Sequence, residues 1–211
     1  MDFLSRFFKN RESESFQPRN KQQTAFRDFR DVICILVGFL LIYVLFFRVV
    51  VVDGRSMNQT LVHGDRILLI SNTLYRNPKQ GDIVVISKDS FRNGECIVKR
   101  VIATEGQRID FDFENRIVYV DGKPLEESYA FFEAGFDGPM DKFDVQSSLV
   151  VEEGCIFVMG DNRNNSMDSR TSEIGLIDCR EVLGKAVFLL LPGTGENGEI
   201  PADYTRIGGL Y

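Results

Sequence analysis

An uncharged apolar run near the N-terminus constrains this chain more than any other feature. Residues 32–47 carry no charge, and Arg48 and four valines follow. A bilayer span usually needs roughly 20 apolar residues, but an arginine at the end can reach the interface and extend the usable length. We therefore predict a retained transmembrane anchor over 32–48. The alternatives are a buried helix or a cleaved secretory signal, which requires small residues after the run; Phe47, Arg48 and Val49 are large.

Basic residues before the run predict its orientation. Residues 1–31 contain seven lysines and arginines. Positively charged flanks stay in the cytoplasm, so we expect a cytoplasmic basic tail, a single-pass anchor in the cell membrane, and an extracytoplasmic domain that begins near residue 49.

Composition excludes several function classes. The 211 residues carry a formal net charge of -6, which argues against a nucleic-acid partner. One histidine and four cysteines without a C-x-x-C spacing give no zinc pattern, so we predict no metal and no cofactor. We interpret the cysteines as small buried residues, with a Cys155–Cys179 disulfide as the alternative.

The exported part has the pattern of a β protein. Short apolar runs bounded by glycine and polar residues lie at 66–70, 82–86, 97–103, 117–120, 155–159 and 187–191. Such runs predict a mainly β domain with an antiparallel sheet or barrel. We assign 49–122 and 149–192 to this domain. Residues 123–148, rich in Gly, Phe and Asp, are expected to form a β-rich insertion, and 193–211 a C-terminal tail.

Ser56 is the candidate nucleophile. It follows Gly54 in a turn-like segment just after the anchor. A serine hydroxyl needs a base to become nucleophilic. His63, the only histidine, is seven residues away in a polar turn, an awkward position for a catalytic pair. A lysine is therefore the better candidate base.

Lys99 lies in the expected strand 97–103. Side chains alternate along a strand, so Lys99 shares a face with Ile97 and Val101, whereas Arg100 points the other way. Burial lowers the pKa of a lysine and makes it a usable base. Alternation leaves open whether Lys99 is covered, Arg100 is covered, or both lie at an edge.

A polar loop follows the apolar run 155–159. Residues 160–170 read Gly-Asp-Asn-Arg-Asn-Asn-Ser-Met-Asp-Ser-Arg. Asp168 and Arg170 can form an ion pair that braces this loop. A calcium loop is excluded because Arg163 occupies a ligand position.

Four segments carry a family resemblance: Gly54-x-Ser56-Met57-x-x-Thr60-Leu61, Gly81-Asp82-Ile83-Val84, Lys99-Arg100-Val101-Ile102, and Gly160-Asp161-Asn162-x-x-x-Ser166-x-Asp168-Ser169-Arg170. In this order behind an anchor, they resemble the sequence boxes of bacterial type I signal peptidases of the single-anchor form. The resemblance covers nearly all of residues 32–192. Gln59, Glu105 and Gln107 depart from the usual family pattern, which has proline at the first position.

The resemblance implies a role for each matched residue. Ser56 attacks the scissile carbonyl and Lys99 accepts its proton. Ser166 hydrogen-bonds the lysine, and Asp168 and Arg170 hold the site in shape. The Ser56 main-chain N–H contributes to an oxyanion hole. Gly54 stands where some members carry a second hydroxyl donor, whereas single-anchor members resemble this chain in having glycine. Met57 is expected to pack beside the nucleophile.

The resemblance also implies the partners. Family members cleave exported preproteins after small residues, at sites of the A-x-A kind, beside membrane lipid. Residues 129–136 either contact the membrane interface or form a local apolar cluster.

Two other hypotheses for the function stay open. A self-cleaving repressor with a serine–lysine pair would need a DNA-binding domain, and 1–31 is too short for one. A non-enzymatic module that binds exported peptides is kept open by Gln59.

Overall fold

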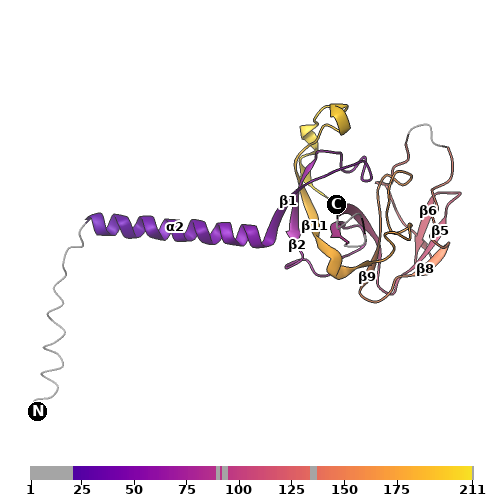
Figure 1. Cartoon of the computed structure of the whole chain (residues 1–211), viewed down its shortest axis with the longest axis horizontal. Coiled ribbons are helices and arrows are strands. Elements are labelled where there is room, and N and C mark those ends of the chain that lie inside the picture. Colours follow the sequence, from indigo (N-terminus) through magenta and orange to yellow (C-terminus); the bar gives the residue numbers. More distant parts are fainter. Residues whose placement is uncertain (1–20, 89–90, 92–94, 134–136, 211) are drawn as a thin grey trace, which may run out of the picture. The chain divides into compact units, whose positions relative to one another are not determined.

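The computed structural model describes residues 21–88, 91, 95–133 and 137–210, with the side chains of 21–24 excepted. By its internal contacts the chain divides into two compact units, residues 1–42 and 43–211. The described part holds one long helix and a set of β-strands (Figure 1). The prediction of a mainly β fold with antiparallel sheets and one N-terminal apolar helix is confirmed.

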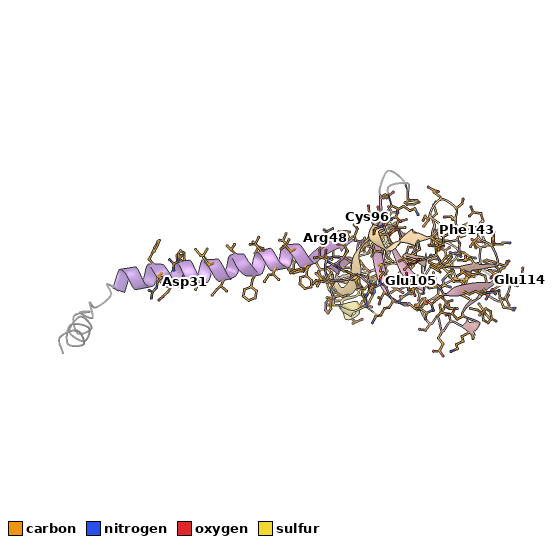
Figure 2. The ribbon with its side chains drawn as sticks, turned by 90° about the horizontal axis from the view of Figure 1, so that it is seen from below. Asp31, Arg48, Cys96, Glu105, Glu114 and Phe143 are labelled. Atoms are coloured by element: carbon orange, nitrogen blue, oxygen red, sulfur yellow. The ribbon has the colours of Figure 1, made fainter. Side chains whose placement is uncertain are left out.

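The helix α2 spans Lys21–Phe46. Its segment Ala25–Phe46 is long and apolar enough to cross a membrane. Its side chains project outward along its length (Figure 2). Large apolar residues among them, such as Leu36 and Phe39, are exposed. The helix starts before residue 32, the expected start of the anchor. It also ends two residues earlier than expected, because the β-branched valines after Arg48 favour a strand.

The larger sheet has eight strands, all paired antiparallel, in the order β1-β2-β11-β3-β4-β9-β10, with β12 added on β11. Its strands are β1 (Phe47–Val51), β2 (Arg66–Ser71), β3 (Ile83–Ser87), β4 (Cys96–Thr104), β9 (Cys155–Met159), β10 (Ile177–Asp178), β11 (Val182–Leu191) and β12 (Gly208–Gly209).

The smaller sheet has the order β7-β6-β5-β8. Its strands are β5 (Arg108–Asp112), β6 (Ile117–Val120), β7 (Lys123–Pro124) and β8 (Ser148–Val150). The smaller sheet therefore begins at Arg108, ahead of the expected insertion start at 123. The reason is local: β5 and β6 pair with each other through a short turn, and neither strand joins the larger sheet.

The residues after β11 are folded, with a short 3₁₀ turn at Glu196–Gly198, another at Tyr204–Arg206, and the pairing of β12 with β11. The expected C-terminal tail is thus an ordered part of the β unit in its described residues.

The core is placed so that β4 is covered on both faces. Residues 99–103 of β4 are all buried, because β4 runs between β3 and β9 in the middle of the sheet. One buried cluster contains Met57, Leu61, Ile67 and Val85; another contains Ile102, Ile109 and Phe157. The position of β4 gives an ionisable side chain at residues 99–103 an environment shielded from water.

Candidate active site

The loop between β1 and β2 carries Ser56. Val52 N–H donates to the Asp65 carbonyl at 2.8 Å and Gly64 N–H donates to the Val52 carbonyl at 2.9 Å, which closes the loop at its base. Gly54 has a φ of +88°, a left-handed conformation that favours glycine. Its N–H donates to Nδ1 of His63 at 3.2 Å. His63 therefore supports the turn that precedes Ser56.

Two apolar side chains anchor the segment that carries the nucleophile. Met57 and Leu61 are 1% and 0% exposed and belong to the same buried cluster. Leu61 N–H donates to the Met57 carbonyl at 2.8 Å, which makes a helical turn. Met57 thus packs into the core directly after the nucleophile.

Lys99 projects from β4 to this serine. Its Nζ lies 2.7 Å from Ser56 Oγ, and the lysine is only 3% exposed. Burial lowers the pKa of Lys99 to about 8, with Asp168 opposing the shift and Arg170 adding to it. At pH 7 about a tenth of Lys99 is then neutral, far more than at the ordinary lysine pKa, and a neutral amine can accept a proton.

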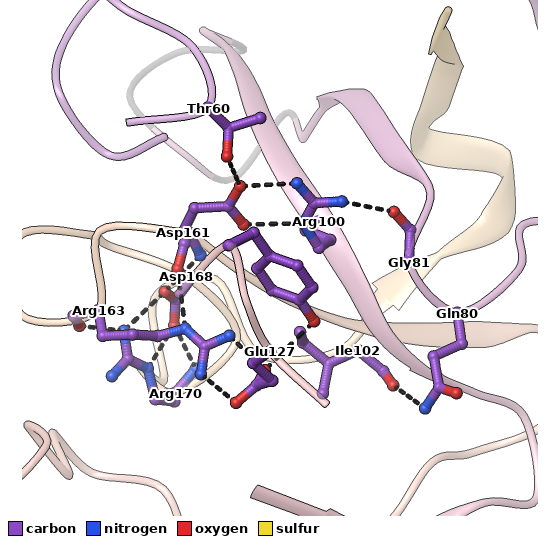
Figure 3. A network of polar contacts seen from close by, with 12 residues as sticks. Thr60, Gln80, Gly81, Arg100, Ile102, Glu127, Asp161, Arg163, Asp168 and Arg170 are labelled. Atoms are coloured by element: carbon purple, nitrogen blue, oxygen red, sulfur yellow. Dashed lines mark hydrogen bonds and ion pairs between the residues drawn. The ribbon is translucent and has the colours of Figure 1, made fainter. Parts of the chain in front are cut away.

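Lys99 is covered, and Arg100 on the opposite face is covered too, so neither a solvent-exposed Lys99 nor an edge position for both residues describes the strand. Arg100 donates from Nε and Nη2 to the two carboxylate oxygens of Asp161, at 2.9 and 2.8 Å, and from Nη1 to the Gly81 carbonyl (Figure 3). Its guanidinium also lies 3.9 Å from the ring centroid of Tyr129. An arginine so partnered can be buried on the face opposite the lysine.

The loop 160–170 is braced by the expected ion pair. Arg170 donates from Nε and Nη2 to the two carboxylate oxygens of Asp168, both at 2.8 Å, and both residues are fully buried. Gly160 N–H also donates to Asp168. Burial acts to raise the pKa of Asp168, but Arg170 outweighs it and the pKa is lowered. The buried charges therefore compensate each other.

Ser166 is buried, but the hydrogen bond to Lys99 that the resemblance implies is not formed. Its Oγ makes no hydrogen bond to any residue that the structure describes. It is nevertheless close: a β-carbon added to Gly160 would be 2.2 Å from Ser166 Oγ and 2.4 Å from the Ser56 carbonyl oxygen. The hydroxyl is thus placed beside the nucleophile with free capacity to donate.

A second group of polar contacts, centred on Asp161 and Arg163, was not predicted from the sequence. Thr60 Oγ1 donates to Asp161 at 2.5 Å, and Arg163 pairs with Glu127. Phe131 N–H donates to the Asp161 carbonyl at 2.7 Å, so the segment before 134 is tied to the polar loop. Asp161 lies in one of the four segments that carry the family resemblance, so the sequence could have indicated its importance. Glu127 lies in a stretch without clear periodicity, where the sequence shows no recognisable pattern.

An open cleft of about 190 Å³ leads to the dyad. Ser56 and Lys99 lie in its wall together with Gly54, and Ile97, Val98 and Met167 supply apolar surface. Among the described residues there is no group of three or more His, Cys, Asp or Glu able to hold a metal ion. The four cysteines are free thiols. The cleft therefore opens onto the contact between Ser56 and Lys99.

Comparison with known proteins identifies the family. The family model described as signal peptidase, peptidase S26, matches residues 26–191. Signal peptidase I of Bacillus licheniformis is 35% identical over 177 residues, covering 82% of this chain and 92% of the relative. Probable signal peptidase I-1 of Synechocystis sp. is 34% identical over 171 residues, covering 75% and 81%. The chain belongs to the signal peptidase family, peptidase S26.

A solved structure also matches in part. The crystal structure of a signal peptidase I from Enterococcus faecalis V583 is 29% identical, with a TM-score of 0.41. The match covers 52% of this chain and 96% of that chain.

Proposed function

We propose that this chain is a membrane-anchored serine endopeptidase that removes signal peptides from exported preproteins, with Ser56 as nucleophile and Lys99 as general base. The observation that carries the proposal is the 2.7 Å contact between Lys99 Nζ and Ser56 Oγ, made by a buried lysine. Membership of the signal peptidase family supports the substrate class.

The first half of the reaction forms an acyl-enzyme. Neutral Lys99 accepts the Ser56 proton while Oγ attacks the scissile carbonyl carbon. The carbonyl oxygen becomes an oxyanion that the Ser56 main-chain N–H stabilises. The C–N bond then breaks, and the Lys99 ammonium gives its proton to the departing amine of the mature protein. The signal peptide remains as an ester on Ser56.

The second half releases the signal peptide. Lys99, neutral again, accepts a proton from a water molecule that attacks the ester carbonyl. The C–O bond to Ser56 breaks, and the proton returns to Oγ. Lys99 serves as the base in both halves, so the rate depends on its neutral fraction.

Ser166, Asp168 and Arg170 support this chemistry in the proposal. Ser166 donates its unpartnered hydroxyl to Lys99 during turnover and orients the amine. Asp168 and Arg170 hold the loop that carries Ser166. Gly54 and Met57 fix the turn on either side of the nucleophile.

The anchor determines where cleavage occurs. Residues 25–46 of α2 have the length and composition of a span, and the basic residues precede them. We infer that the tail is cytoplasmic, that α2 crosses the cell membrane, and that the β unit acts on the extracytoplasmic side. Protease added outside intact spheroplasts should then degrade the β unit. If the β unit is degraded only after lysis, the orientation is the opposite of the one inferred.

Cleavage of a preprotein with an A-x-A site tests the function. The full chain in detergent is compared with Ser56→Ala, Lys99→Ala and two matched controls at exposed positions, Ser147→Ala and Lys123→Ala. We expect the wild type and both controls to cut at the A-x-A site, and the dyad variants to be inert. If the wild type binds the preprotein but does not cleave it, the protein is a peptide-binding module and not a protease.

A further inference from the structure

The C-terminal segment 193–210 contacts the loop that carries Ser56 at several points, although more than a hundred residues separate them. Figure 1 draws this segment at the yellow end of the colour range, and β12 within it pairs with β11. Gly195 N–H donates to the His63 carbonyl at 3.1 Å. Arg55, the residue before the nucleophile, pairs with Glu196 at 3.1 Å and Glu199 at 2.7 Å. The mechanism described above uses none of these contacts.

Asp65 is the centre of this interface. Its carboxylate is fully buried and accepts hydrogen bonds from Val62 N–H at 2.8 Å and Gly193 N–H at 2.6 Å. Arg206 donates to both of its oxygens, at 3.1 and 2.6 Å. A buried carboxylate is costly unless it is paired. Arg206 therefore supplies the compensating charge at the base of the Ser56 loop.

Arg206 also reaches the backbone of the nucleophile segment. Its Nη2 donates to the Thr60 carbonyl at 3.1 Å. The Thr60 hydroxyl donates to Asp161, and Asp161 pairs with Arg100, the neighbour of Lys99 in β4. One guanidinium thus lies at the end of a series of contacts that joins the segment of Ser56 to the strand of Lys99.

The backbone around Arg206 is itself held. Asp203 accepts from Thr205 N–H and caps the 3₁₀ turn at Tyr204–Arg206. Immediately after that turn, Gly208 and Gly209 pair with Leu189 and Phe188 of β11. The arginine therefore projects from an ordered turn fixed to the sheet.

From these contacts we infer that Arg206 is a positioning residue, which fixes residues 60–65 and thereby the distance between Ser56 Oγ and Lys99 Nζ. This inference rests on the proposed roles of Ser56 and Lys99. Arg206 does not line the cleft, so it acts on the geometry of the dyad and not on peptide binding.

The test uses the full chain in detergent, with Arg206→Gln, Arg206→Lys and the control Arg180→Gln. Arg180 forms an exposed ion pair with Asp178. A displacement of about 1 Å at a reacting group can lower a rate about 100-fold. We expect Arg206→Gln to lower kcat roughly 10- to 100-fold with KM within about twofold, and Arg180→Gln to match the wild type.

Hydrogen exchange separates positioning from general stability. Amides of 54–61 should exchange faster in Arg206→Gln, whereas those of β3 and β4 should not. The pH midpoint of kcat should stay in place, because Lys99 is not moved. Arg206→Lys keeps the charge beside Asp65 but loses the fork that reaches Thr60, so it should fold and show an intermediate kcat.

Two results would overturn the inference. One is a wild-type kcat in Arg206→Lys and in the folded fraction of Arg206→Gln. The other is a loss of rate that follows the unfolded fraction alone. Ser56→Ala, assayed in parallel, keeps the two proposals apart. If Ser56→Ala is inert and the Arg206 variants are fully active, only the positioning role fails. If Ser56→Ala cleaves like the wild type, the proposed function fails.

Discussion

Gly160 lies against the backbone of Ser56 so closely that a β-carbon at Gly160 would be 2.4 Å from the Ser56 carbonyl oxygen. Two residues further on, Asn162 N–H donates to that same oxygen at 3.0 Å. The polar loop is therefore docked directly on the nucleophile, and its first residue has no room for a side chain.

Gly160→Ala is expected to lower kcat at least about 100-fold, because the added β-carbon would collide with Ser166 Oγ and with the backbone of Ser56, and Ser56 must then move. Gly208→Ala is the matched control: it lies in β12, and an added β-carbon would have nothing within 4 Å. Activity of the folded protein is the measurement. Equal activity of the two variants would show that the loop does not fix Ser56.

Asp168→Asn removes one charge of a buried ion pair. Arg170 would be left as an uncompensated buried cation, which costs about 3–5 kcal/mol. Denaturant unfolding of the full chain should show this loss, together with reduced cleavage. Asp178→Asn breaks the exposed pair with Arg180 and should leave the unfolding midpoint in place. A midpoint for Asp168→Asn close to that of the wild type would contradict the bracing role.

Ser166→Ala separates a catalytic role from a structural one. The Ser166 hydroxyl is buried and makes no hydrogen bond within the described residues, so its removal should not lower the free energy of unfolding. If the hydroxyl orients Lys99 during turnover, kcat should fall roughly 10- to 100-fold. A stable variant with full activity would show that Ser166 does not contribute to cleavage.

Strands were predictable where an apolar run is bounded on both sides by glycine or polar residues. Each of the six apolar runs identified in the sequence falls within a strand of the structure, except that β3 starts at Ile83, one residue after the start of the run 82–86. Strand β1 was missed because its valines continue the apolar run of the anchor. Strand β5 was missed because Arg108, Asp110 and Asp112 leave only two apolar residues in it. Short polar strands become strands through their partners, which periodicity does not reveal.

The proximity of Ser56 and Lys99 was predictable from local pattern and resemblance, but the surroundings of the two residues were not. Alternation left Lys99 and Arg100 as competitors, and the structure buries both because Asp161 neutralises the arginine. The pairing of Arg206 with Asp65 joins residues 141 positions apart. Nothing in the sequence indicates that Asp65 and Arg206 will pair, because only the folded chain brings them together.

Lys99→Met tests the cost of burying the lysine. The folded-state pKa of Lys99, about 8, is below the ordinary value of 10.5, so the cost is present below pH 8 and disappears as pH rises through 10.5. The variant should be inactive but more stable than the wild type by roughly 1–3 kcal/mol at pH 6, with a smaller gain at pH 10. Thermal unfolding at both pH values checks this, and an equal loss of stability at both would contradict it.

The pH dependence of kcat/KM for preprotein cleavage tests the central claim most directly. Only neutral Lys99 can accept the Ser56 proton, so kcat/KM, which reports on the free enzyme, should rise about tenfold per pH unit below the pKa and level off above a midpoint near 8. Thermal unfolding across the same range confirms that the enzyme stays folded. A kcat/KM that is flat, or that falls, from pH 6 to pH 9 would contradict Lys99 as the general base.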